Sequence, residues 1–472
     1  MTYPPRHVVL FAAALLSGCA GFSPDGGMEQ VRDILPPQSG KDAALLRTPE
    51  DAQAARTIVA ALLQKPLNAD NAVRIALLNN RDLQASYNAL GLSEAALVQA
   101  SLPPNPAFKF SRLAGGGELE IERQIALNIL SLVTLPARAE IAADRYRQAQ
   151  FRAAGETLRV ALEARRAFLR AVAARELVGF LGQAKSAAET AAQLSKRLGE
   201  TGAATKLDQA RNQVFYAELA GQVALSQRRA ASERERLVRA LGLWGRDLEF
   251  RLPAALPALP SKPRASAAVE IEAVRRRVDL QAARLEVEAL AKSYGLTGAT
   301  RFINLLEVGG KSKTVHEPDG SHRHERGFEV EFQVPLFDFG EVRQRQAEAS
   351  YLEAVNRLTA RAVNARSEAR EAYQAYRSAY DVARHYRREI LPLRKIISEE
   401  TLLRYNAMQI DEFALLAEAR QRIASTSAAI EAQRDFWLAD ANLTGAILSG
   451  GSTAVPEGGT AVAAPTEALG AH

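Results

Sequence analysis

Cysteine and the common motifs of catalysis are nearly absent from this chain. Cys19 is the only cysteine in 472 residues, so no intrachain disulfide bond can form. The sequence contains no nucleophile elbow, no HExxH motif and no dinucleotide-binding glycine fingerprint. Residues 309–312, GGKS, end like a phosphate-binding loop, but Leu305 stands where that loop needs its first glycine, and no helix follows. We therefore predict a protein that is not an enzyme and has no cofactor.

Long apolar runs are also scarce. The clearest one, residues 8–19, follows Arg6 and His7 and is shorter than the roughly 20 residues that a membrane-spanning helix needs. This pattern is typical of a signal peptide, here over residues 1–18. With that segment removed, any part of the chain that crosses a membrane must do so as β-strands, because only helices and closed barrels satisfy their backbone groups in lipid.

The end of this apolar run predicts a lipid anchor. Leu16 to Cys19 resemble the lipobox of bacterial lipoproteins, in which the cysteine carries fatty acyl groups such as palmitate and becomes the mature N-terminus. The alternative is a free cysteine buried in an apolar N-terminal helix.

Charge of one sign is not concentrated anywhere. The chain has 60 Lys and Arg against 54 Asp and Glu, a net charge of +6, and the two signs are interleaved. Proteins that bind nucleic acid usually gather basic residues in one patch or arm. The pattern indicates solvated helix faces and no nucleic-acid partner.

What the chain does contain is a small number of strands with one apolar face. Phe328, Val330, Phe332 and Val334 alternate with polar residues, which places them on one face of a strand because successive side chains point to opposite sides. The same alternation of apolar and polar residues, or a short segment close to it, predicts strands over residues 107–113, 118–127, 301–308 and 328–334. Each of the two pairs is followed by helical spacing over tens of residues.

The helices are long, and their order repeats. No strong helix breaker lies between Pro136 and Gly199, which predicts a rod of roughly 90 Å. A second rod begins at Glu341 and is interrupted at Pro392; within it, apolar and alanine residues recur at the a and d spacing of a coiled coil from Val355 to Ala383. Helices, two strands, a long helix, a turn and a helix occur twice, about 204 residues apart, which indicates an internal duplication.

This repeat defines the predicted domains. The mature chain divides into an N-terminal tether (19–65), a first repeat (66–244), a Pro-rich linker (245–266), a second repeat (267–448) and a disordered tail (449–472). The fold class is mainly α with a small β part.

In this order the features resemble the TolC family of outer-membrane efflux proteins, lipoprotein branch. The resemblance spans about Pro66 to Leu448, and its most specific segments are LNADNAVRIALLNNRDLQ, VPLFDFGEVRQRQAEA, RLGETGAATKLDQAR and RYNAMQIDEFALLAEAR. It implies a homotrimer in which each chain adds four strands to a shared twelve-stranded β-barrel and its helices to a hollow periplasmic α-helical barrel.

The resemblance also implies residue roles. Apolar strand residues such as Phe328, Val330, Phe332, Leu119, Ile121 and Ile125 would face lipid, and Glu118, Glu120, Glu122, Glu329 and Glu331 would face the aqueous lumen. The two helical turns would form the periplasmic tip. Candidate gate residues there are Asp208, Asp411, Glu412, Glu418, Arg197, Arg404 and Arg420, the arginines bridging the acids to hold a closed state; the alternative is ordinary solvated helix charge.

A histidine-rich segment is a further candidate site. Residues 309–327 hold His316, His322 and His324, and imidazoles suit zinc, copper and nickel. We favour a flexible extracellular loop over a metal site, because no cysteine and no regular ligand spacing accompany the histidines.

The leading hypothesis is an outer-membrane channel that serves as the exit duct of a tripartite efflux or secretion system. It would pass small molecules, drugs or metal ions from the periplasm to the exterior, driven by an inner-membrane pump through a periplasmic adaptor. The alternatives are a non-conducting lipid-anchored periplasmic coiled-coil scaffold or adaptor, and a metal-sequestering surface lipoprotein.

Overall fold

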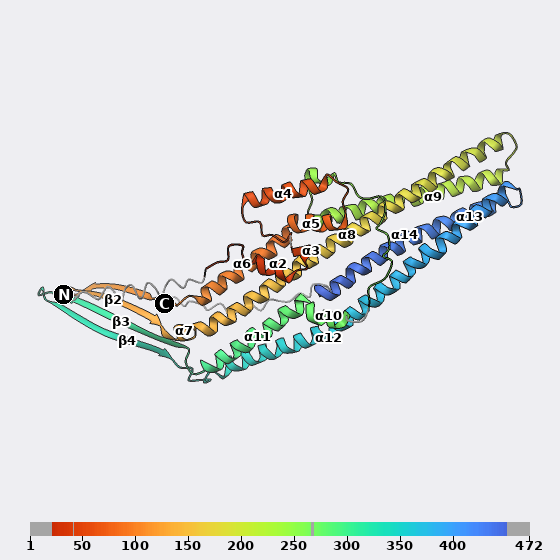
Figure 1. The fold of residues 1–472 in the computed structure, drawn as a ribbon. Helices are drawn as coiled ribbons and strands as arrows, with labels where there is room; N and C mark the ends of the chain where they lie inside the picture. The colour runs from red at the N-terminus through yellow and green to blue at the C-terminus, as the bar shows by residue number, and fades with distance from the viewer. Residues whose placement is uncertain (1–20, 41, 266–268, 451–472) are drawn as a thin grey trace.

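The molecule is elongated, with a β-sheet at one end and the tips of long helical hairpins at the other (Figure 1). The computed structural model describes residues 21–40, 42–265 and 269–450. The predicted signal peptide and Cys19, and residues 451–472 of the predicted tail, lie outside the described residues.

The sheet is formed by strands from both halves of the sequence. Its order is β1 (Ala107–Gly115), β2 (Glu118–Asn128), β3 (Leu305–His316) and β4 (His322–Gln333), with every neighbouring pair antiparallel. The first two predicted strands are confirmed to within two residues. The β2–β3 pairing joins Leu119 to His316 and so connects the two repeats.

The second hairpin corrects a prediction. Residues 309–327 are not a flexible loop, because β3 and β4 run through them and leave only residues 317–321 between the strands. The strands continue because the backbone of β3 pairs with both β2 and β4, and Lys313 also forms an ion pair with Glu120 of β2 at 2.7 Å. Gly309 lets the backbones approach closely, since a Cβ there would lie 2.8 Å from the Ile125 carbonyl oxygen.

Two helical hairpins extend away from the sheet. The first is α8 (Leu135–Glu200) with α9 (Lys206–Leu241). The second is α12 (Glu341–His385), a π-helical turn (Tyr386–Ile390) and α13 (Leu391–Asn406), which return as α14 (Glu412–Leu448). The predicted interruption at Pro392 is confirmed: proline has no N–H for the helical ladder, and the wider π turn precedes it.

Shorter helices lead into each pair of strands. α5 (Ala69–Asn79) and α6 (Arg81–Ser101) precede β1, whereas α10 (Val269–Arg276) and α11 (Val278–Ala299) precede β3. The order of elements is therefore the same in both halves, as the predicted duplication requires.

The predicted N-terminal tether contains helices, and the expectation that residues 20–48 are extended is wrong where α2 (Met28–Ile34) and α3 (Pro37–Gly40) form. They are followed by α4 (Pro49–Leu63), which precedes α5 and begins with a capping box at Thr48. Met28 and Val31 are buried in the main core, where burial of two apolar side chains outweighs the glycines and prolines nearby.

The linker between the repeats is also packed. It starts with a 3-10 turn (Gly245–Leu248), and Phe250, Leu252 and Leu256 are buried in the main core. The α8 side chains Arg175 and Glu176 hold it, since the Arg175 guanidinium donates to the Leu252 carbonyl and the Leu256 N–H donates to Glu176 at 2.8 Å.

The main core lies midway along the molecule, where α5, α6 and α9 pack on α8. A smaller cluster joins Tyr376 and Tyr380 of α12 to Phe436 of α14. The small residues Ala365, Ala369 and Ala383 of α12 are buried, which confirms the predicted seam of that helix. Within the described residues no helix combines the length and apolarity needed to span a membrane.

Candidate functional site

One face of the four-stranded sheet is charged. The strand register places all five acids predicted for the lumen on this face, with Lys109, Lys311 and Lys313. Lys311 pairs with Glu122 at 2.9 Å and Lys313 pairs with Glu120 at 2.7 Å. The acidity of this face is therefore partly neutralised toward the hairpin ends of the strands.

Three acids without a cationic partner lie nearer the helices, and a fourth, Glu118, lies at the hairpin end of β2. Glu329 accepts a hydrogen bond from Gln124 at 2.7 Å, and Glu307 and Glu331 are directly paired in the β3–β4 ladder. None of these three carboxylates forms an ion pair with another described residue. The net negative charge of this face is concentrated at that level.

The opposite face of the sheet is apolar over the same length. Phe328 is 85% exposed and Phe108 is 76% exposed, and they share a row with Ile125 between them. Aromatic side chains this exposed are unusual on a surface in contact with water. No described part of the chain covers the Phe328 and Phe108 rings.

The joints between strands and helices differ in structure. After β4, Phe339 and Gly340 adopt positive φ values of 47° and 72°, and the Phe339 carbonyl accepts from Arg301 at 2.7 Å. A Cβ at Gly340 would lie 2.2 Å from the Arg301 carbonyl oxygen, which excludes other residues there. After β2, the chain instead forms the short helix α7 (Ile129–Val133), capped by Asn128, before α8 begins.

Two tight turns form the far end of the molecule. The α8–α9 turn uses Gly202 with a φ of 79°, whereas the α13–α14 turn uses Met408, whose φ of 59° is rare for a residue with a side chain. Thr205 and Asp411 cap the helices that leave these turns.

The predicted gate acids have distinct local roles. Asp208 lies 2.5 Å from the Thr205 hydroxyl and belongs to the cap of α9, and Asp411 accepts from the Ala414 N–H at 2.9 Å. Glu418 pairs with Arg394 at 3.1 Å and braces the α13–α14 hairpin. Glu412 accepts a hydrogen bond from Asn212 of α9.

The predicted gate arginines also differ in the contacts that they make. Arg420 pairs with Glu218 of α9 at 3.0 Å and lies over the Phe215 ring. Arg197 and Arg404 make no side-chain hydrogen bond or ion pair with the described part of this chain. Within one chain, therefore, only Arg420 of the three connects the two hairpins.

A set of polar links joins α9 to α14, and most of its members were not predicted. Besides Asn212 with Glu412 and Glu218 with Arg420, Arg229 pairs with Glu431 at 3.2 Å. The partners are 200, 202 and 202 positions apart, close to the offset of the duplication. We call these three pairs the α9–α14 links. They join nearly equivalent positions of the two repeats.

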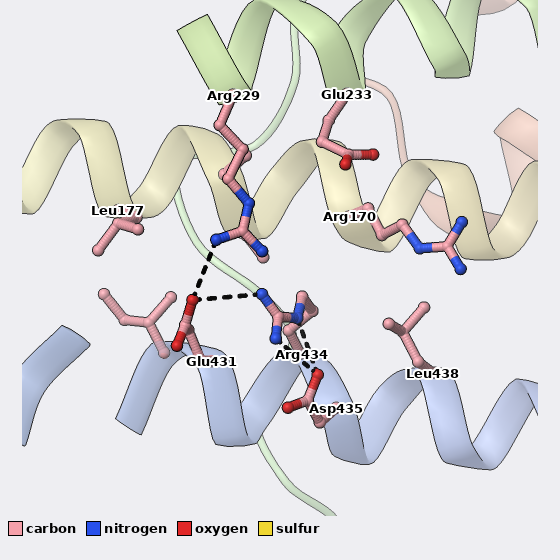
Figure 2. Close-up of a pocket in the computed structure, with 11 residues that line it drawn as sticks. Arg170, Leu177, Arg229, Glu233, Glu431, Arg434, Asp435 and Leu438 are labelled. Carbon is pink, nitrogen blue, oxygen red and sulfur yellow. Dashed lines mark hydrogen bonds and ion pairs between the residues drawn. The ribbon is translucent and has the colours of Figure 1, made fainter. Parts of the chain in front are cut away.

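A cavity of about 230 Å³ lies beside the last of these links, between α8, α9 and α14 (Figure 2). Glu431 lies between Arg229 and Arg434, which approach it at 3.2 and 3.5 Å. Glu233 pairs with Arg236, and its Oε2 atom is buried without a hydrogen-bond partner among the described residues. The helices here are separated by charged side chains and are not sealed by apolar packing.

The three histidines lie together at the distal end of the sheet. His316 and His322 are paired across the β3–β4 hairpin with ring centroids 4.4 Å apart, and His324 lies 3.1 Å from the Thr314 hydroxyl. In the described residues no group of three or more His, Cys, Asp or Glu side chains is arranged to hold a metal ion.

Comparisons with known proteins identify one domain and the fold. Residues 271–397 match the family model described as outer membrane efflux protein. The chain carries an outer membrane efflux protein domain and has a TolC-type fold. No curated protein sequence matches it significantly.

Solved structures support the same TolC-type fold over most of the chain. A membrane protein from Pseudomonas aeruginosa superimposes with a TM-score of 0.69 at 18% identity, covering 80% of this chain and 93% of that one. The open state of the Neisseria gonorrhoeae MtrE outer membrane channel gives 0.59 at 18%, covering 80% and 88%. The Campylobacter jejuni CmeC outer membrane channel gives 0.61 at 15%, covering 84% and 86%.

In this TolC-type chain, one signal for the unpredicted contacts was present in the sequence. The repeat offset of about 204 residues leads from Arg420 to residue 216, two positions before its partner Glu218. Composition alone did not contain this signal, because charged residues are spread along every helix.

Proposed function

We propose that this chain is a subunit of an outer-membrane efflux channel that conducts solutes passively from the periplasm to the exterior. The observation that carries the proposal is the sheet, which has an exposed apolar face on one side, a charged face on the other, and two long helical hairpins continuing from one end. An apolar outer band and a polar interior are the requirements of a membrane barrel.

The edges of the sheet support a homotrimer. β1 and β4 are the outer strands of the sheet, so each has a row of backbone groups without a strand partner in the described chain. Such groups must be paired inside a membrane. Three copies joined β4 to β1 would give a closed barrel of twelve strands, which satisfies them.

The α9–α14 links supply a device for closing the periplasmic end. They join the hairpin of the first repeat to that of the second through one part-buried hydrogen bond and two exposed ion pairs, and the exposed pairs are individually weak. A periplasmic adaptor that binds the tip more tightly when the hairpins separate would shift the channel toward an open state. An inner-membrane pump would supply the energy and choose the cargo among small molecules, drugs and metal ions, and lipidation of Cys19 would anchor the chain.

Conductance of the purified protein in planar lipid bilayers tests this proposal. We expect discrete channels from a species that crosslinks as a trimer, and a larger open fraction after Glu218→Gln with Glu431→Gln. If a correctly folded trimer gives no conductance with or without these substitutions, the channel is excluded and a lipid-anchored scaffold or adaptor is favoured.

A further inference from the structure

The apolar face of the sheet carries three arginines and no acid. In the register of the four strands, Arg112 of β1, Arg123 of β2 and Arg326 of β4 share this face with Phe108 and its apolar neighbours. Every Asp and Glu of the described strands lies on the charged face. The positive charge of this face is therefore not compensated by the sheet itself.

The three arginines lie at one level. Arg123 and Arg326 both align with Ser312 of β3, so they are separated by one strand, or about 10 Å. Arg112 is two residues beyond Phe110, the direct partner of Arg123, and is therefore its diagonal neighbour across the β1–β2 pair.

Their side chains are exposed and have no partner. The side chains of Arg112, Arg123 and Arg326 form no hydrogen bond or ion pair with any described residue, whereas Lys311 and Lys313 on the charged face are both paired. Exposed arginines on an otherwise apolar surface lose hydration when lipid covers that surface, unless an anion reaches them.

The position of the three arginines along the strands indicates which kind of anion could bind them. The rows toward the helices hold Phe328, Val330 and Phe332 on β4. Beyond Arg326, the side chains of β3 and β4 on this face are polar, whereas β2 still carries Ile121 and Leu119 there. The arginines thus lie near the distal end of the apolar band, where a membrane changes from acyl chains to headgroups and a long cationic side chain can reach them. Guanidinium groups match phosphate oxygens in a bidentate geometry.

We propose that Arg112, Arg123 and Arg326 form a binding site for the phosphate groups of a phosphorylated lipid in the outer leaflet of the membrane. The proposal rests on the proposed channel function, which sets the distal end of the sheet outside. A closed trimer has three such sites, each on the outer wall of the barrel and remote from the conduction path.

Native mass spectrometry of the detergent-solubilised trimer tests this site. The probes are lipid A with both phosphates and the same lipid after removal of the phosphates. We expect selective binding of the phosphorylated form by the native chain, and a loss on the order of a hundredfold in Arg112→Gln/Arg123→Gln/Arg326→Gln, since each basic side chain near an anionic lipid surface contributes about fivefold.

The matched control removes cations from the charged face. Lys109→Gln/Arg323→Gln should retain the preference for phosphorylated lipid. Arg326→Gln alone provides a milder test if the triple variant does not assemble, with a loss of about fivefold. Equal binding of both lipid forms by the native chain, or an equal loss in the control variant, would overturn the proposal.

Bilayer conductance of the same samples separates the two hypotheses. A native trimer that conducts but does not distinguish the lipids overturns the lipid site and leaves the channel intact. A native trimer that does not conduct excludes the channel, whatever lipid it binds.

Discussion

Arg277 is a buried cation at the junction of α10 and α11. Its side chain is 3% exposed, and its guanidinium group pairs with Asp279 at 2.9 Å and with Glu368 of α12 at 2.6 Å. The two carboxylates are about one-third exposed, so they retain part of their hydration. This one residue therefore fixes both the break between two helices and their position against α12.

We predict that Arg277→Met destabilises the chain by about 3 kcal/mol, because removal of one partner leaves two carboxylates partly buried without a cation. Thermal and urea unfolding followed by circular dichroism would measure the loss. Arg276→Met is the control: Arg276 makes an exposed pair with Glu272 four residues earlier, which is worth about 0.5 kcal/mol. An equal effect of the two substitutions would show that the burial of Arg277 is unimportant.

Glu176 gives the fold a pH dependence. Burial raises its pKa above the ordinary value of 4.5, and the hydrogen bond from the Leu256 N–H offsets part of this rise. The folded chain therefore holds the Glu176 proton more tightly than the unfolded chain does. As the pH rises from 4.5 through the raised pKa, the free energy of unfolding falls.

We expect Glu176→Gln to remove this fall in the free energy of unfolding. The glutamine amide oxygen still accepts the hydrogen bond from the Leu256 N–H, and the side chain carries no charge that would be buried. Unfolding midpoints measured from pH 4 to 8 should fall less steeply for the variant than for the native chain. Glu163→Gln, an exposed carboxylate on the same helix, should leave the slope unchanged. Identical slopes for the native chain and Glu176→Gln would contradict the assignment.

At the scale of elements, the α9–α14 links govern how the two hairpins separate. Glu218→Gln with Glu431→Gln removes the two ion pairs that join the hairpins in each chain, each worth about 0.5 kcal/mol. In a trimer the six pairs amount to about 3 kcal/mol, so we predict that the ratio of open to closed channels rises roughly a hundredfold. Single-channel recording would measure this ratio.

The control for this prediction changes the same number of carboxylates within single helices. Glu156 pairs with Arg159 in α8, and Glu353 pairs with Arg357 in α12. Glu156→Gln/Glu353→Gln should leave the open fraction as it is. A similar rise in both variants would assign the effect to net charge and not to the links.

Helices and strands could be predicted from the sequence where the local spacing of apolar residues and helix breakers specifies them. The rod of α8 and the strands β1 and β2 were predicted nearly to the residue, since spacing and breakers specify them. The prediction of a flexible loop around His316 is wrong. The strand character of this segment depends on pairing with β2, and partners nearly 200 residues away in the sequence leave no local signal.

The sequence predicted which segments form the candidate site, but it predicted few of the contacts between their side chains. Glu120 shares one face with Glu122 of the same strand, and Glu329 shares one with Glu331, because the period of a strand requires it. The neutralisation of Glu120 by Lys313 and the hydrogen bond from Gln124 to Glu329 depend on register between hairpins. The partners of Arg420 and Glu418 likewise follow from how helices lie side by side.

For the whole molecule, the arrangement of charge predicts a weak preference for cations. Glu307, Glu329 and Glu331 lack cationic partners in the described chain and lie at one level of the charged face. Glu329→Gln/Glu331→Gln should lower the cation-to-anion permeability ratio by roughly twofold, a modest effect because a wide aqueous pore screens charge beyond about 8 Å.

Reversal potentials in a salt gradient would measure that ratio at two ionic strengths. Glu325→Gln is the control, because Glu325 lies farther along the strand and already has Arg323 at 3.4 Å. We expect the difference between native and variant channels to shrink at high salt. A difference that does not depend on salt would argue against a screened field.

The pairing of β2 with β3 has a consequence for the order of folding. Each strand hairpin and each helical hairpin joins neighbouring segments, and such local contacts form quickly. The central seam of the sheet, by contrast, joins Leu119 to His316, so it cannot exist until more than half of the chain has been synthesised. The first hairpin must wait with its aromatic face and its strand edges uncovered, which makes it the segment most exposed to aggregation. A holding chaperone that binds extended aromatic segments would therefore protect β1 and β2 more than any other part of the newly made chain.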